Sequence, residues 1–281
     1  MPLDQPQEEA EMSFLDHLEE LRWHIVRSLT TIAVGMVVAF IFSKWIFTSI
    51  IFAPANPDFP TFQALCRLGE LVGNPALCVQ EIPFKVQSRY MTGQFTMQIM
   101  ASFVIGFIIA FPYVVWELWR FIKPGLHSHE RNNSRGAVSA ISLLFFMGSA
   151  FGYFVLCPLM TWFFASYSIS DMISNEFDIT SYVSTFVALV FGSGLLFQLP
   201  VVVYFLTRIG LLTPQFMRTY RKHAIIVILI IGAIVTPPDP LSQVLISLPL
   251  VILYEISIFI SAYVVRQNRK REEEELKAER L

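Results

Sequence analysis

The sequence of 281 residues is 54% hydrophobic and only 15% charged. Because an ordinary soluble domain carries about 25% charged residues, this composition excludes a typical soluble enzyme. The formal net charge of −2 provides no overall positive field, so no nucleic-acid partner is expected. Segments 136–170 and 179–207 contain no Asp, Glu, Lys, Arg or His, and each is long enough to cross a bilayer.

The apolar residues gather in six blocks. A block that crosses the membrane must be helical, because an open strand leaves its backbone polar groups unpaired in lipid. The sequence therefore predicts an all-α polytopic membrane protein with six transmembrane helices. In chain order the blocks cover residues 23–42, 97–116, 137–157, 183–203, 224–235 and 241–265.

The basic residues indicate how these blocks are oriented. Most of the 20 Lys and Arg residues lie before the first block, in every second gap between blocks, and after the last block. By the positive-inside rule, both termini are expected in the cytoplasm. We expect three regions: a cytoplasmic amphipathic helix at 1–22, a membrane domain at 23–265 with an external loop at about 53–92, and a charged cytoplasmic tail at 266–281.

The fifth block is short. A helix over residues 224–235 rises only about 18 Å, whereas the hydrocarbon core of a bilayer is about 30 Å thick. We expect either that the bilayer thins beside this helix or that the side chains of Arg221 and Lys222 extend to the interface.

The external loop contains five prolines, so turns are expected to order it more than long helices. One short helix is predicted, with Thr61 as its N-cap and Gly73 at its end. Cys66 and Cys78 lie in this loop on the expected oxidising side of the membrane, which favours a disulfide between them. The alternative is two free thiols whose backbones lie too far apart to be bridged.

A polar stripe in the N-terminal helix contains Glu20, His24 and Arg27. One interpretation is a solvated face on which Glu20 pairs with His24 one turn later. The other is a carboxylate that is displayed at the cytoplasmic surface for a cationic partner. The residues alone favour the solvated face.

A second candidate carboxylate, Glu130, lies in the cytoplasmic connection between the second and third blocks. Ser128 would cap the third helix and place Glu130 in its first turn, where the helix dipole alone explains an acid. The spacing of His127, His129 and Glu130 matches no recognised metal-ligand set, so neither a metal nor another cofactor is expected.

Polar and small residues also interrupt the later blocks. Gln198 lies beside Pro200 in the fourth block and is expected to hydrogen-bond between helices. Glu255, an ionisable residue within the sixth block, is either functional or a structural group paired to a neighbouring Ser or Tyr. The spacing of Gly148 and Gly152 predicts close packing between two helices.

Three spaced motifs together resemble those of the TatC family, the core receptor subunit of the twin-arginine protein translocase. The resemblance extends over about residues 14–265. The motifs are FLDHLEELR at 14–22, WRFIKPGL at 119–126 followed by HER at 129–131, and TPPD at 236–239 followed by SQ at 242–243.

The resemblance implies a receptor that binds folded proteins by a signal peptide with two consecutive arginines. A carboxylate accepts two hydrogen bonds from a planar guanidinium, which Lys cannot match. On the motif positions, the resemblance assigns Glu20 and Glu130 to this pocket, with Phe121 packing beside it and Arg22 supporting its geometry. No catalytic residues are implied, and the protein is not expected to be an enzyme.

The resemblance also implies partners in the cell inner (cytoplasmic) membrane. Single-span TatA and TatB proteins are expected to dock on the fourth to sixth spans, within a hetero-complex that also contains further copies of this chain and is driven by the proton gradient. Many members carry Glu at the position of Gln198, so a neutral hydrogen bond is expected to replace a charged contact here. The expected partner-docking or membrane polar residues are Gln198, Asp239, Gln243 and Glu255.

Two functions of other classes were considered. An ion-coupled secondary transporter would use Glu255 as its proton carrier, but the sequence has no internal repeat of the kind such folds show. An intramembrane serine protease would use Ser193, but its glycine spacing is wrong and His223 is expected at the cytoplasmic end of the fifth block rather than at the depth of the serine.

Overall fold

The computed structural model describes residues 14–79, 81–122, 134–170, 172–236 and 240–278. These residues are almost entirely helical, which confirms the predicted all-α class. Loops connect the helices, and within the described residues there is one short parallel strand pair between β1 (Val86–Gln87) and β2 (Phe177–Asp178), with Val86 opposite Phe177.

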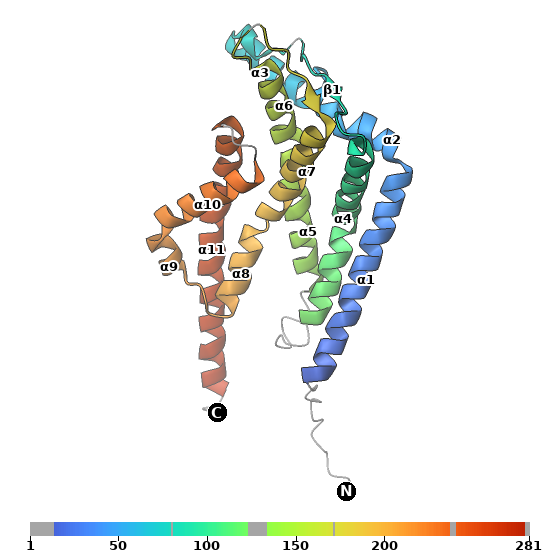
Figure 1. The fold of residues 1–281 in the computed structure, drawn as a ribbon. Coiled ribbons are helices and arrows are strands. Elements are labelled where there is room, and N and C mark those ends of the chain that lie inside the picture. The colour runs from blue at the N-terminus through green and yellow to red at the C-terminus, as the bar shows by residue number, and fades with distance from the viewer. Residues whose placement is uncertain (1–13, 80, 123–133, 171, 237–239, 279–281) are drawn as a thin grey trace.

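Long helices form the body of the molecule (Figure 1). The third span is one continuous rod, because a π-helical turn at Gly152–Leu156 joins α5 to α6. The fourth span bends at Phe197 and Gln198, between α7 and α8, where Pro200 interrupts the backbone ladder. The long helices are α1 (Phe14–Ile41), α4 (Gly93–Ile122), α5 (Ser134–Phe151), α6 (Cys157–Ser166), α7 (Ile179–Leu196), α8 (Leu199–Arg208) and α11 (Pro240–Ala278).

Within the described residues, five helical segments are long and apolar enough to cross a membrane: Glu19–Ile41, Gly93–Phe121, Gly136–Ser166, Ile179–Arg208 and Ser242–Lys270. They correspond to five of the six predicted blocks. The remaining block forms α10 (Arg221–Val235), which has 15 residues and rises about 22 Å. This helix is shorter than the five segments, as its sequence predicts.

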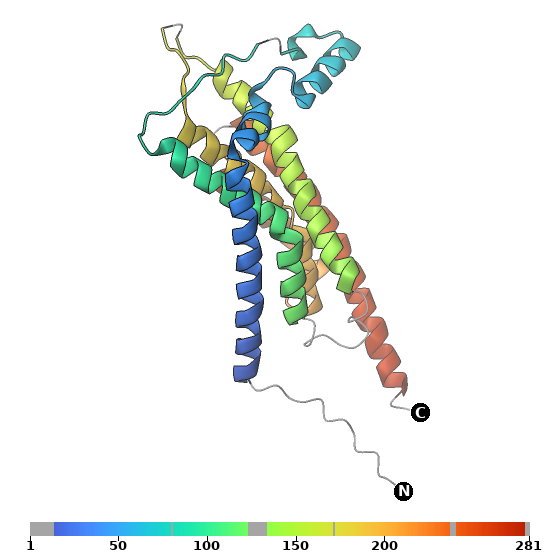
Figure 2. The same ribbon diagram turned by 90° about the vertical axis from the view of Figure 1, so that its right-hand side faces the viewer.

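The start of α1 and the end of α11 lie at one end of the bundle, and a cap of short elements covers the other end (Figures 1 and 2). The connection between α8 and α10 contains α9 (Pro214–Thr219). The cap contains α2 (Ser43–Ile46), a π turn (Phe47–Ile51), short 3-10 turns at Ala53–Ala55 and Pro75–Leu77, and α3 (Pro60–Val72).

The cap corrects one expectation and supports others. Thr61 is not the N-cap of α3, because the helix begins at Pro60 and the Thr61 hydroxyl donates to the backbone oxygen of Phe154. Gly73 ends the helix in the left-handed region, with a φ of 72°. A disulfide joins Cys66 to Cys78, the pairing that the sequence favours.

Small residues let the long helices approach closely. A Cβ atom on Gly148 would lie 2.6 Å from the backbone oxygen of Ser193, so the predicted close packing between α5 and α7 is confirmed. The Ser193 hydroxyl donates across this contact to the backbone oxygen of Gly148, at 2.8 Å. A second close crossing, between α1 and α4, was not predicted: a Cβ on Gly35 would lie 2.9 Å from the backbone oxygen of Gly106.

Candidate functional site

A buried polar network links α1 to α4 near the end of the bundle where α1 begins. The imidazole of His24 donates from Nδ1 to the Glu117 carboxylate, and the Tyr113 hydroxyl donates to Glu117 Oε1 at 2.8 Å. Glu117 is only 1% exposed and His24 only 5% exposed. Because a buried carboxylate is stable only when its oxygens are hydrogen-bonded, His24 and Tyr113 make this position possible.

His24 faces α4 rather than water, whereas Glu20 and Arg27 of the same stripe are at least partly exposed. His24, Ser28 and Ile32 are buried one turn apart, and the Ser28 hydroxyl donates back to the oxygen of His24 at 2.9 Å. The interpretation of this stripe as a solvated face is therefore wrong in that His24 is buried, whereas the predicted pairing of Glu20 with His24 is present as an ion contact of 3.9 Å. The physical reason is that lipid would surround the other faces of α1, so its polar residues turn toward the partner helix.

Glu20 lies at the rim of a polar pocket with a volume of about 440 Å³, and His24 lies deeper in the same pocket. The Glu20 side chain is 40% exposed, and its Oε1 lies 3.9 Å from His24 Nε2. This contact is too long for a hydrogen bond. The Glu20 carboxylate is therefore free to accept hydrogen bonds from a ligand.

Arginines surround this pocket. Arg27 and Arg120 line it together with Glu20, His24 and Trp23. The Arg120 guanidinium lies over the ring of Trp116 at 4.9 Å, and its Nη1 is 3.8 Å from Glu117 Oε1. Among the described residues that line the pocket, Glu20 is the only acid. This part of the pocket has too few acids to hold two cationic groups.

Of the four residues that the resemblance assigns to the peptide pocket, Glu20 and Phe121 both adjoin His24, whereas Arg22 contacts Trp23. The ring of Phe121 meets the His24 ring edge to face, with centroids 6.2 Å apart, and Glu20 lies one turn before His24. The Arg22 guanidinium is stacked over Trp23 at 5.5 Å. Glu130, together with Ser128 and its neighbours, lies outside the described residues.

Three of the four polar residues expected in the later spans are described, and none of these three lines this pocket. Gln198 donates from Nε2 to the oxygen of Ile141 at 3.2 Å, and its buried Oε1 has no hydrogen-bond partner in the described part of the chain. Gln243 donates to the oxygen of Leu229 at 2.7 Å and so links α11 to α10. Asp239 lies outside the described residues.

Glu255 has a different partner from the one expected. Its Oε2 accepts a hydrogen bond from Arg221 Nη2 at 2.7 Å, and both side chains are partly exposed. Of the two alternatives for Glu255, the one that pairs it with a neighbouring Ser or Tyr is therefore wrong, and its functional role stays a proposal. Beside this pair, the Tyr254 hydroxyl donates to the oxygen of Met217 at 2.9 Å, which holds α9 against α11.

Glu117 and Tyr113 were missed by the sequence reasoning. The predicted second block ends at residue 116 and leaves Glu117 just outside it. A signal was present: an acid at the edge of a long apolar block, four residues after a Tyr that a helix places on the same face.

Comparisons with known proteins identify the family. Residues 16–249 match the family model for the Sec-independent protein translocase protein, TatC. The chain belongs to the TatC family. Its relatives include the TatC proteins of Blattabacterium sp. (strain BPLAN), 37% identical over 93% of this chain and 99% of the relative, and of Halalkalibacterium halodurans, 33% identical over 94% of each chain.

Solved structures agree with this assignment. Two crystal structures of a TatC twin-arginine translocase receptor, one of them in DDM, superpose with TM-scores of 0.67 and 0.70 at 30% and 31% identity. They cover 89% and 87% of this chain, and 99% of each solved chain. As a TatC protein, the chain is a multi-pass membrane component of a protein translocase and not an enzyme. The family assignment decides against the transporter and protease interpretations.

Proposed function

We propose that this TatC protein binds twin-arginine signal peptides of folded proteins with Glu20 and Glu130. The observation that carries the proposal is the position of Glu20, half-exposed and without a hydrogen bond, above a buried network that fixes the surrounding side chains. Phe121 packs at the same place through its contact with His24. The relatives of known structure are twin-arginine translocase receptors.

The charges around the pocket explain why two acids are needed. Arg27 and Arg120 line the pocket and repel an incoming cation, so Glu20 alone leaves the site unfavourable for a pair of arginines. Glu117 cannot compensate, because it is fully buried and already accepts bonds from His24 and Tyr113. A second accessible acid, for which we propose Glu130, supplies the missing acceptor.

The membrane orientation follows from the basic residues. We place the start of α1 and the end of α11 in the cytoplasm, with the disulfide-bearing cap on the outside, as the positive-inside rule requires. Helix α10 is the fifth of six spans in this arrangement, and α11 is the sixth. The membrane is the inner (cytoplasmic) membrane, where a receptor for proteins made in the cytoplasm must present its pocket.

We assign the docking of single-span TatA and TatB partners to the surface of α8, α10 and α11. The face of α10 is broadly apolar and exposed at Ile226, Ile230 and Ile234, which suits a partner helix in lipid. Asp239 and Gln243 adjoin this surface in sequence, and we propose that Gln198 and Glu255 are the further polar residues of this docking region. The assembly contains several copies of the chain and uses the proton gradient.

The peptide site is tested by binding of a labelled twin-arginine signal peptide to the purified full chain in detergent. Charge-assisted hydrogen bonds contribute on the order of 1.5 to 3 kcal/mol, so Glu20→Gln and Glu130→Gln are each expected to weaken binding by roughly 10-fold or more. A peptide with two lysines binds less well than one with two arginines. Glu70→Gln, an exposed acid in α3, is the matched control and leaves the affinity unchanged. Unchanged affinity in both pocket variants refutes the assignment.

A further inference from the structure

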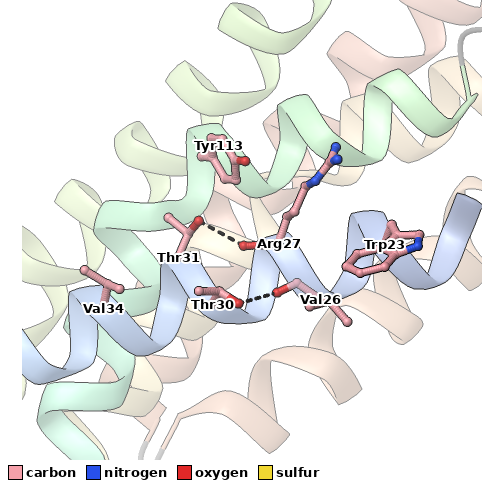
Figure 3. A pocket seen from close by; sticks show the side chains of 7 residues that line it. All are labelled: Trp23, Val26, Arg27, Thr30, Thr31, Val34 and Tyr113. Carbon is pink, nitrogen blue, oxygen red and sulfur yellow. Dashed lines mark hydrogen bonds between the residues drawn. The ribbon is translucent and has the colours of Figure 1, made fainter.

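The proposed peptide site makes no use of a second groove between α1 and α4, which adjoins the polar pocket (Figure 3). This groove has a volume of about 400 Å³ and shares Trp23 and Arg27 with the pocket. A polar compartment therefore continues directly into a more apolar one. The groove is lined by Trp23, Val26, Arg27, Thr30, Thr31, Val34 and Tyr113.

Arg27 is the least explained residue of this groove. It lies inside the candidate span Glu19–Ile41, about two helical turns or roughly 12 Å from the start of the span. Its side chain is exposed, and within the described part of the chain it forms neither a hydrogen bond nor an ion pair. A lipid-exposed guanidinium at this depth requires water or an anion as a partner.

The direction of the Arg27 side chain indicates where an anion would bind. Figure 3 shows it extending along α4 toward the Trp23 end of α1, which is the direction of the nearer membrane surface. Trp23 is 52% exposed there, as expected for an aromatic residue at the headgroup level. Arg120 lines the adjoining pocket, and its ion contact with Glu117 is long, at 3.8 Å. Two guanidinium groups are thus available to one anion.

The rest of the groove suits an acyl chain. The hydroxyls of Thr30 and Thr31 donate to backbone oxygens of their own helix, at 2.7 Å and 2.9 Å, so neither offers a free donor to a ligand. Val26 and Val34 lie along the same groove. A ligand here has an anionic end toward the cytoplasmic surface and an apolar end toward the middle of the membrane.

We propose that this groove binds a phospholipid with an anionic headgroup, such as phosphatidylglycerol. Its phosphodiester lies between Arg27 and Arg120, and one acyl chain follows Val26 and Val34. Glu20 and the buried Glu117 are the acids nearest to this region, and Glu20 stays available to the peptide. Within the groove itself a cationic segment fits less well than a lipid, because it would meet Arg27 and no acid lines the groove.

Native mass spectrometry of the detergent-purified full chain, titrated with phosphatidylglycerol or phosphatidylcholine, tests the site. Arg27→Gln is expected to lower the phosphatidylglycerol-bound fraction at least fivefold and to abolish the preference over phosphatidylcholine. Arg27→Lys keeps the positive charge and is expected to retain most of the binding. This result would show that Arg27→Gln loses the lipid because of the missing charge and not because of misfolding. Val34→Trp, which fills the groove, lowers the binding of both lipids. The matched control is Arg218→Gln, an exposed arginine of α9 outside the groove, which changes neither.

Three results overturn the proposal. The first is equal phosphatidylglycerol occupancy in the wild type and in Arg27→Gln. The second is displacement of the lipid by millimolar inorganic phosphate alone, which would show that the acyl groove contributes nothing. The third is loss of twin-arginine peptide binding, but not of lipid binding, in both Arg27→Gln and Val34→Trp, which would make the groove part of the peptide site.

Discussion

Glu117 and His24 are separated by 93 residues in the chain and form a hydrogen bond across the interface of α1 and α4, where both are buried. This pair fixes the turn of α1 that carries Glu20 and the end of α4 that carries Phe121. The geometry of the proposed peptide pocket therefore depends on a polar contact that is shielded from solvent. The loss of the hydrogen bond between His24 and Glu117 is therefore expected to change the position of Glu20 and Phe121 in the pocket.

Removing one partner of this pair destabilises the protein more than removing both. Glu117→Leu leaves the buried His24 without its acceptor, which costs on the order of 1 to 3 kcal/mol. The double variant Glu117→Leu with His24→Leu regains part of that loss, because the buried imidazole is no longer left without an acceptor. Thermal unfolding in detergent measures the stability of the single and the double variant. A double variant that is less stable than Glu117→Leu contradicts the account.

Adding a side chain at position 106 is expected to push α1 and α4 apart. A Cβ there would overlap the backbone of Met36, and backbone yields less readily than a flexible side chain, so Gly106→Val is expected to destabilise by about 1 to 3 kcal/mol. Gly136, whose Cβ position has no neighbour within 4 Å, provides the control Gly136→Val. Equal melting temperatures for the two variants would show that the crossing is looser than described.

The ionisation of Asp178 reports on the structure at the cap end of the bundle, where β2 pairs with β1. The hydrogen bond from the Thr180 side chain, aided by the backbone N–H of Arg89 at 2.9 Å, holds the pKa of Asp178 below its ordinary value. A lowered folded-state pKa contributes stability that is present above the unfolded-state pKa of about 3.9 and is lost as the pH falls through the folded-state value. Carboxyl NMR titration is expected to give a higher midpoint in Thr180→Val than in the wild type. Identical midpoints would contradict the role of Thr180.

The disulfide holds the cap of α3 together. Closing a loop between Cys66 and Cys78, 12 residues apart, stabilises by roughly 3 kcal/mol in the chain-entropy model. Reduction is therefore expected to increase hydrogen exchange in α3 while the amides of α4 stay protected, and intact mass after alkylation confirms that two thiols were released. Unchanged exchange in α3 would show that packing alone orders this helix.

The sequence predicts the architecture well and the site only in part. Long apolar runs settle the helical class, and the position of Gly148 and Gly152 indicates close packing, because both signals are local. His24 and Glu117 lie far apart in the chain, and the contact between them appears only when α1 and α4 are placed side by side. The ion pair between Arg221 and Glu255 is missed for the same reason: it depends on the depth at which the short α10 begins.

The central claim is that Glu20 contacts an arginine of the signal peptide. A double-mutant cycle tests it directly, with Glu20→Gln on the protein and a single Arg→Gln change in the peptide, and with affinities measured on the purified full chain. The account predicts non-additive losses with a coupling of about 1 kcal/mol or more for one of the two arginines. Strictly additive losses at both arginines would contradict the contact.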